Sequence, residues 1–373
     1  MRRFAIAVVV GAVLAAGCSS SGSKAASTTT TSAGSTTTGA PTTTKTAPVT
    51  PTTAPTHAIT VAAPSVSASF VSSQEGFALE RNGQIDATTD GGQTWHRAGN
   101  LGRSGEDEII RYIDAADGFA FQRLNGGLFI THDGGASWIK LTTPFSNVAD
   151  LAILHGTVDL VALHTGSTVN FQIWSSPVAH LVWKQDPLTL PVGAGPVPSV
   201  QIVLAGNRGW IVNSNRTVIA GAQLGTNGRW ANWTPPCKAF GGDAGLAAPT
   251  SSDLVAVCSP GPATPASLAM TSRSQFSHNG GTLFVSRPIP NAKFGAGGPL
   301  SPTADVAVII DAGDLRRTTN GGATWQVVAT ATGSSGGADY GFTTSTQGFI
   351  ILANGRMLMT YDAGATWKQV TLP

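Results

Sequence analysis

A short motif that combines turn-forming residues with a tryptophan occurs four times in this chain. It reads Thr-x-Asp/Asn-Gly/Ala-Gly-x-Thr/Ser-Trp, and its copies are TTDGGQTW (88–95), THDGGASW (131–138), TTNGGATW (318–325) and TYDAGATW (360–367). Glycines and a short polar side chain favour a tight turn, and the tryptophan supplies a large apolar surface. Motifs at a regular spacing are typical of stacked or radial architectures, so this one constrains the fold strongly.

The spacing of the motif predicts the number of repeats. The tryptophans of the first two copies are 43 residues apart, and those of the last two are 42 apart. The 187 residues between the second and third copies divide best into four intervals of about 47. Three diverged repeats are therefore expected, around Trp183, Trp233 and Phe284, which gives seven repeats in all.

Each clear repeat contains four short runs with β-type composition, separated by turn residues. In the first repeat the runs are ASFVSS, GFALERNG, GQIDATTDGG and TWHRAG. This pattern is typical of a four-stranded blade, so we predict an all-β, seven-bladed β-propeller over residues 58–373. Six or eight blades remain alternatives, and the pattern leaves open whether HAITVAA (57–63) adds an edge strand that closes the ring.

The motif resembles the Asp-box, or BNR repeat, of sialidases and related β-propellers. The longer repeat, F-x-S-x-x-x-G-F-x-L-x-x-x-G-x-I/L-x-x-T-x-D-G-G-x-T-W, covers nearly all of residues 60–373. It is similar to the photosystem II assembly and stability factor family, also described as BNR-like or sortilin-like propellers. The resemblance implies a binding and assembly protein rather than an enzyme, and it says little about the partner.

We interpret the motif residues as structural. The polar residue of each copy is expected to bond to backbone N–H groups within its turn, and the tryptophan to pack one blade against the next. These residues are Asp90, Trp95, Asp133, Trp138, Asn320, Trp325, Asp362 and Trp367. One carboxylate per blade cannot form a shared metal site. His155, His164 and His180 are expected on separate strands, so we predict neither a metal nor a cofactor.

The N-terminal region has the features of an export signal. Residues 1–17 combine two arginines with a short apolar run and small residues, and Cys18 follows as in a bacterial lipobox. We expect Cys18 to be lipidated and residues 18–57, rich in Ser, Thr and Pro, to form a disordered tether. An ordinary secretory signal is the alternative. The protein is thus predicted to be anchored on the extracytoplasmic face of the cell membrane.

Composition restricts the partners and the redox state. Charged residues make up 11% of the chain and the net charge is +2, so no nucleic-acid partner is expected. After Cys18 the cysteines are Cys237 and Cys258, which in an exported protein favours a disulfide; two free buried thiols are the alternative. We expect a monomer.

An enzymatic reading is the main alternative in function. Sialidase chemistry requires an arginine triad and a tyrosine paired with a glutamate, and the Phe-Arg-Ile-Pro motif that supplies the first arginine does not occur. Tyr112, Glu106 and Glu108 form only a partial constellation. A glycoside hydrolase or lyase with its site at the channel mouth therefore stays second to a binding or scaffold module, and a purely structural envelope protein stays third.

Arginines in or near the predicted turns between the second and third strands suggest where a ligand binds. They are Arg81, Arg123, Arg216, Arg316 and Arg356. These turns lie on the face opposite the motif turns, so the five side chains could surround one mouth of the central channel. Such a ring would suit an acidic peptide or an anionic envelope glycan. The competing interpretation is that they are ordinary solvated arginines.

Overall fold

A computed structural model describes residues 64–193, 199–260, 271–292, 298–311, 313–330 and 337–373. The chain divides into two units, Met1–Ala58 and Ile59–Pro373, and the described residues belong to the second. The predicted signal (1–17), Cys18, the tether (18–57) and the segment 57–63 lie outside them. No helix in the described part of the chain is long and apolar enough to span a membrane.

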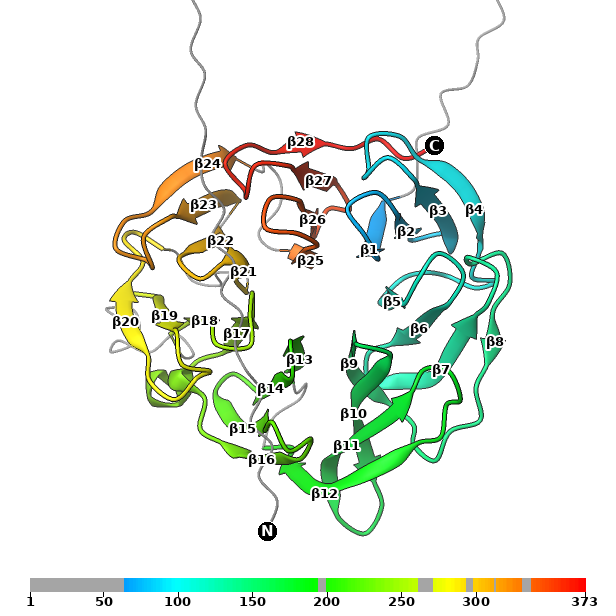
Figure 1. Cartoon of the computed structure of the whole chain (residues 1–373), viewed down its shortest axis with the longest axis horizontal. Helices are drawn as coiled ribbons and strands as arrows, with labels where there is room; N and C mark the ends of the chain where they lie inside the picture. The colour runs from blue at the N-terminus through cyan, green and yellow to red at the C-terminus, as the bar shows by residue number, and fades with distance from the viewer. Residues whose placement is uncertain (1–63, 194–198, 261–270, 293–297, 312, 331–336) are drawn as a thin grey trace, which may run out of the picture. The chain divides into compact units, whose positions relative to one another are not determined.

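The described residues form seven four-stranded antiparallel sheets arranged around a centre, which confirms the predicted seven-bladed propeller (Figure 1). Each blade is one continuous stretch of chain, with its first strand innermost. Blade 1 comprises β1 (Ser65–Phe70), β2 (Gly76–Glu80), β3 (Gln84–Thr88) and β4 (His96–Asn100). Blade 2 comprises β5 (Glu108–Tyr112), β6 (Gly118–Gln122), β7 (Asn125–Thr131) and β8 (Ile139–Lys140). Blade 3 comprises β9 (Val148–Leu154), β10 (Thr157–Thr165), β11 (Val169–Pro177) and β12 (Lys184–Pro191). Blades 4 and 5 comprise β13 (Ser199–Ala205), β14 (Arg208–Ser214), β15 (Val218–Leu224), β16 (Trp230–Trp233), β17 (Ala244–Ala247), β18 (Leu254–Cys258), β19 (Arg273–Ser277) and β20 (Val285–Pro288). Blades 6 and 7 comprise β21 (Leu300–Thr303), β22 (Val306–Asp311), β23 (Asp314–Thr318), β24 (Gln326–Thr330), β25 (Gly337–Phe342), β26 (Gly348–Leu352), β27 (Met357–Thr360) and β28 (Lys368–Gln369).

The hydrophobic core lies between the blades. The second strands are almost entirely buried, whereas the outermost strands are largely exposed. Because neighbouring residues of a strand point to opposite faces, each blade offers apolar side chains to both of its neighbours. Within the described residues, six of the seven interfaces hold one cluster of seven to eleven buried residues. The interface between blades 5 and 6 instead holds two clusters of three.

The predicted disulfide is present. Cys237 lies on the short 3₁₀ helix η1 (Pro236–Phe240), which connects blades 4 and 5, and pairs with Cys258 at the end of β18; their Cα atoms are 5.1 Å apart. Both cysteines are buried. On the loop-entropy argument, closing the 21-residue separation contributes about 3 kcal/mol to stability.

Blades 1 and 7 meet without exchanging a strand among the described residues: β1–β4 complete the first blade and β25–β28 the last. The two blades are joined by contacts instead. The backbone N–H of Ser65 donates to the Gly355 carbonyl at 3.0 Å, and the Tyr361 hydroxyl donates to the Gly91 carbonyl at 2.9 Å. Phe70 packs against Phe349, with 5.6 Å between ring centroids. In this part of the chain the ring therefore closes through side-chain packing and hydrogen bonds.

Candidate functional site: the central cavity

The four motif copies form the turns between the third and fourth strands of their blades. In blade 2, Thr131 Oγ1 accepts the N–H of Gly135 at 2.9 Å and donates to Asp133 at 2.8 Å. Asp133 also accepts the backbone N–H and the hydroxyl of Ser137, at 2.9 and 2.6 Å. The side-chain hydrogen bond from Ser137 is the main reason why the pKa of Asp133 falls to about 2. The carboxylate is thus committed to holding its own turn.

A fifth turn of this kind occurs in blade 5, and the sequence reasoning missed it. In Ser277–Phe284, Ser277 Oγ accepts the N–H of Gly281 at 2.9 Å, and Asn279 Oδ1 accepts that of Leu283 at 2.9 Å. Phe284 stands where the other copies have tryptophan, which concealed the match. Trp233 of blade 4 compensates, because its indole N–H donates to the Gly281 carbonyl at 3.0 Å. The Ser-x-Asn-Gly-Gly pattern was the available signal.

On the inner strands, side chains from one blade bond to the backbone of the next. Ser67 of β1 accepts the N–H of Ile110 in β5 at 3.1 Å, and Asp150 of β9 accepts that of Ile202 in β13 at 3.0 Å. Gln201 of β13 pairs in both directions with the backbone of Leu246 in β17, at 2.7 and 2.9 Å. All three polar residues occupy the third position of their inner strand.

Asp339, the third residue of β25, extends this pattern across three blades. It forms two hydrogen bonds with the guanidinium of Arg111 in β5, at 2.9 and 3.1 Å. It also accepts the Ser67 hydroxyl at 2.6 Å and the backbone N–H of Ala68 at 3.1 Å. A bidentate pair of this kind is strong and geometrically specific. Arg111 is therefore committed to linking blades 7, 1 and 2.

The inner strands of blades 2 to 7 line a central cavity of about 510 Å³. Its polar lining includes Arg111, Arg123, Asp150, Asp339 and Tyr340. Each inner strand pairs with only one other strand, so its second edge faces the centre of the ring. Side chains of the preceding blades already bond to backbone groups of Ile110, Ile202 and Leu246 on these strands. Backbone groups that stay unpaired on a strand edge can bond to another chain.

Of the five predicted arginines, Arg123 lies at the cavity. It is exposed in the turn between β6 and β7, and it forms no hydrogen bond or ion pair with any described residue. Arg316 pairs with Asp311 at 2.9 Å, and Arg356 donates to Gln369 at 3.1 Å. Arg81 and Arg216 lie in exposed turns and, like Arg316 and Arg356, do not line the cavity.

Burial raises the pKa values of two titratable groups in the cavity wall. Burial raises the pKa of Asp150, and the nearby charges of Arg123 and Arg111 oppose that rise. Burial also raises the pKa of Tyr340 to about 12, so its hydroxyl remains protonated at neutral pH. Asp339, Arg111 and Arg123 place charges of both signs at the cavity.

The residues of the partial sialidase constellation are used elsewhere. Tyr112 is buried between blades and stacks on Phe77, with 3.6 Å between ring centroids. Glu108 pairs with Arg103 at 2.9 Å, and none of Tyr112, Glu106 and Glu108 lines the cavity. His155, His164 and His180 lie in the β9–β10 turn, in β10 and after β11, and the described residues contain no group of acids, histidines or cysteines suited to a metal ion.

Fold and site together define a seven-bladed propeller with a polar central cavity. No family model matches the sequence, and no curated protein is similar to it. Among solved structures, one described as YCF48 bound to D1 peptide is 17% identical, with a TM-score of 0.55 over 81% of this chain and 94% of that one. YCF48 from Cyanidioschyzon merolae is 13% identical, with a TM-score of 0.56 over 82% and 97% of the two chains. A streptogramin B lyase is 11% identical, with a TM-score of 0.54 over 83% and 93%. Likeness at these identities shows the fold alone.

Proposed function

We propose that this chain is a binding module of the cell envelope that holds an acidic segment of a partner protein at the mouth of the central cavity. The observation that carries the proposal is Arg123, a cavity-lining guanidinium without a hydrogen-bonded partner among the described residues. Arg111, by contrast, is neutralised by Asp339. A ligand carboxylate would therefore form its ion pair with Arg123.

The cavity of about 510 Å³, with charged side chains and strand backbone in its wall, suits a polypeptide segment. Backbone groups of the inner strands that no neighbouring side chain occupies can bond to a peptide, while the side chains of the cavity wall select its sequence. One of the similar propellers is bound to a peptide, which supports this class of ligand. Export, lipidation at Cys18 and a tether over 18–57 complete the proposal, and they would place the propeller on the extracytoplasmic face of the membrane.

Site-specific photo-crosslinking in the full chain tests the binding site. A photoreactive amino acid at Ser199, an exposed residue of the cavity wall, should capture a discrete partner, whereas one at Val182, 69% exposed outside the cavity, should not. Arg123→Glu should lower the yield at position 199 about tenfold or more, the loss expected for one charged hydrogen bond. Arg81→Glu, a charge reversal outside the cavity, is the matched control.

Equal capture at positions 199 and 182, or an unchanged yield in Arg123→Glu, would contradict the proposal. A crosslinked glycan instead of a protein would change the ligand class. The hydrolase alternative is tested separately with fluorogenic sialosides and other glycosides. Turnover that is lost in Asp150→Asn or Tyr340→Phe would favour an enzyme.

A further inference from the structure

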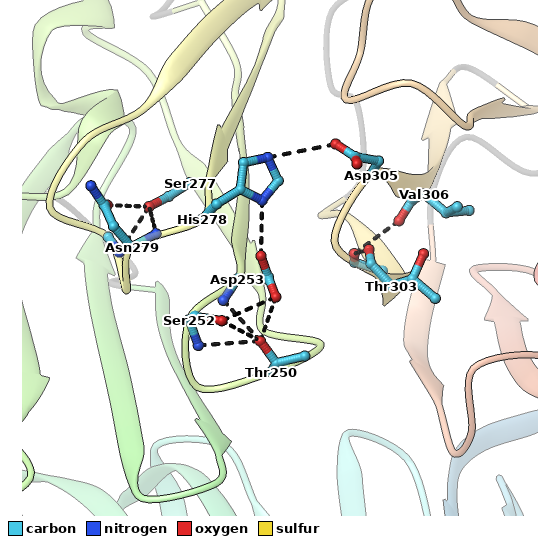
Figure 2. Close-up of polar contacts among 11 residues, drawn as sticks. Thr250, Ser252, Asp253, Ser277, His278, Asn279, Thr303, Asp305 and Val306 are labelled. Atoms are coloured by element: carbon cyan, nitrogen blue, oxygen red, sulfur yellow. Dashed lines mark hydrogen bonds and ion pairs between the residues drawn. The ribbon is translucent and has the colours of Figure 1, made fainter. Parts of the chain in front are cut away.

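His278 lies between two carboxylates that belong to different blades (Figure 2). It is the second residue of the fifth turn, in blade 5. Its Nδ1 atom is 2.8 Å from Asp253 Oδ1, in the β17–β18 turn of the same blade. Its Nε2 atom faces Asp305 Oδ1 in the β21–β22 turn of blade 6, at 3.5 Å.

Asp253 is held in place as an anion. Its Oδ2 atom accepts the hydroxyls of Thr250 and Ser252, at 2.5 and 3.3 Å. Burial tends to raise the pKa of Asp253, but the hydrogen bonds from Thr250 and His278 outweigh it, and the pKa is lowered. The fixed carboxylate orients the imidazole, so that Nε2 points towards blade 6.

The protonation of the imidazole decides whether both contacts are hydrogen bonds. A neutral imidazole has one N–H and one lone pair, and a carboxylate can only accept. With both nitrogens facing carboxylates, the neutral ring satisfies one of them and the protonated ring satisfies both. We propose that His278 is a proton-operated bridge that fastens blade 5 to blade 6 when the imidazole is charged.

The bridge lies at the interface between blades 5 and 6, where the apolar core consists of two small clusters. Val255, Phe276 and Ala307 form one cluster of buried residues there, and Val257, Ile289 and Ile309 form the other. The guanidinium of Arg208, from blade 4, lies beside Gly280 in this turn and is a further charged group there. Asp253, Asp305 and Arg208 are thus the charged groups around His278.

Blade 2 provides a natural comparison. His132 is also the second residue of its turn, and its Nδ1 atom is 2.5 Å from Asp117 in the same blade. The corresponding turn of the next blade contains His155 and Gly156 and no carboxylate. His132 therefore has the contact within its blade and lacks the contact between blades.

A double-mutant cycle of His278→Gln and Asp305→Asn in the full chain, with thermal unfolding at pH 5.5 and pH 8.0, tests the bridge. His278 and Asp305 are 50% and 58% exposed, so these variants should fold. Asp305→Asn should lower the Tm by roughly 1–3 °C at pH 5.5 and by less than about 1 °C at pH 8.0, as for an exposed ion pair. In the His278→Gln background the effect of Asp305→Asn should not depend on pH.

His132→Gln is the control, because in that background Asp305→Asn should keep its full pH dependence. Hydrogen exchange adds a local measurement: at pH 5.5, Asp305→Asn should speed exchange in blades 5 and 6 and leave blade 2 unchanged. An effect of Asp305→Asn on the Tm that is equal at both pH values, or whose pH dependence persists in the His278→Gln background, would overturn the proposal. The test is independent of ligand binding in the cavity.

Discussion

At the scale of single residues, the propeller buries a carboxyl group where an apolar residue would be expected. Val158 and Leu160 belong to the core between blades 2 and 3, so strand alternation turns Asp159 towards blade 4. Asp159 is only 7% exposed. Burial is the main cause that raises its pKa to about 6; the indole of Trp230 partly offsets the rise, and the charge of Asp186 adds to it.

We predict that Asp159→Asn stabilises the protein at neutral pH. The folded-state pKa of about 6 exceeds the ordinary value of 3.8, so ionisation costs stability as the pH rises between these values and the full cost remains above them. The gain should be up to about 3 kcal/mol at pH 7.5 and should vanish near pH 4. Urea unfolding at the two pH values measures it, and a gain of equal size at both would refute the ionisation argument. Asp186→Asn should recover a smaller part of the cost.

At the scale of the elements, the turns made the blades predictable, while the contacts between blades did not appear in the sequence. Thr88, Thr131, Thr318 and Thr360 act within a few residues of their own strand, so a local pattern reveals them. Arg123 was predicted from its position in a turn, as one of five arginines, and it lines the cavity. Arg111 and Asp339 are 228 residues apart in the chain, and only the closed ring brings them together. In the sequence, such contacts correspond to a polar residue at the third position of an inner strand.

Thr131→Val should show what one turn contributes. Valine keeps the shape of threonine but leaves the N–H of Gly135 without its acceptor in a buried position. We expect a loss of about 1–3 kcal/mol in the free energy of unfolding, the usual cost of an unsatisfied buried donor. Chemical denaturation measures the loss. Thr131→Ser retains the hydroxyl and is the control, so a serine variant as unstable as the valine variant would show that the methyl group matters more than the hydrogen bond.

At the scale of the whole molecule, the meeting of blades 1 and 7 is the point where the ring depends most on individual side chains. The described strands of each of these blades come from one end of the chain, so noncovalent contacts join them. An apolar cluster that includes Phe349, Met357 and Met359 covers this interface, and Asp339 supplies its polar part at the inner strands. We therefore expect that loss of Asp339 would open the ring first between blades 1 and 7.

Asp339→Ala tests this expectation. The substitution removes the carboxylate that accepts from Arg111, the Ser67 hydroxyl and the Ala68 N–H, and breaking a largely buried ion pair costs about 3 kcal/mol or more. Hydrogen exchange should become faster in β1 and β25 while β14 in blade 4 stays protected. Gln201→Ala removes the third-position side chain between blades 4 and 5, so it should cost about 1 kcal/mol and expose β17 instead. If Asp339→Ala loosened all seven blades equally, the propeller would unfold as one cooperative unit and the closure between blades 1 and 7 would have no special role.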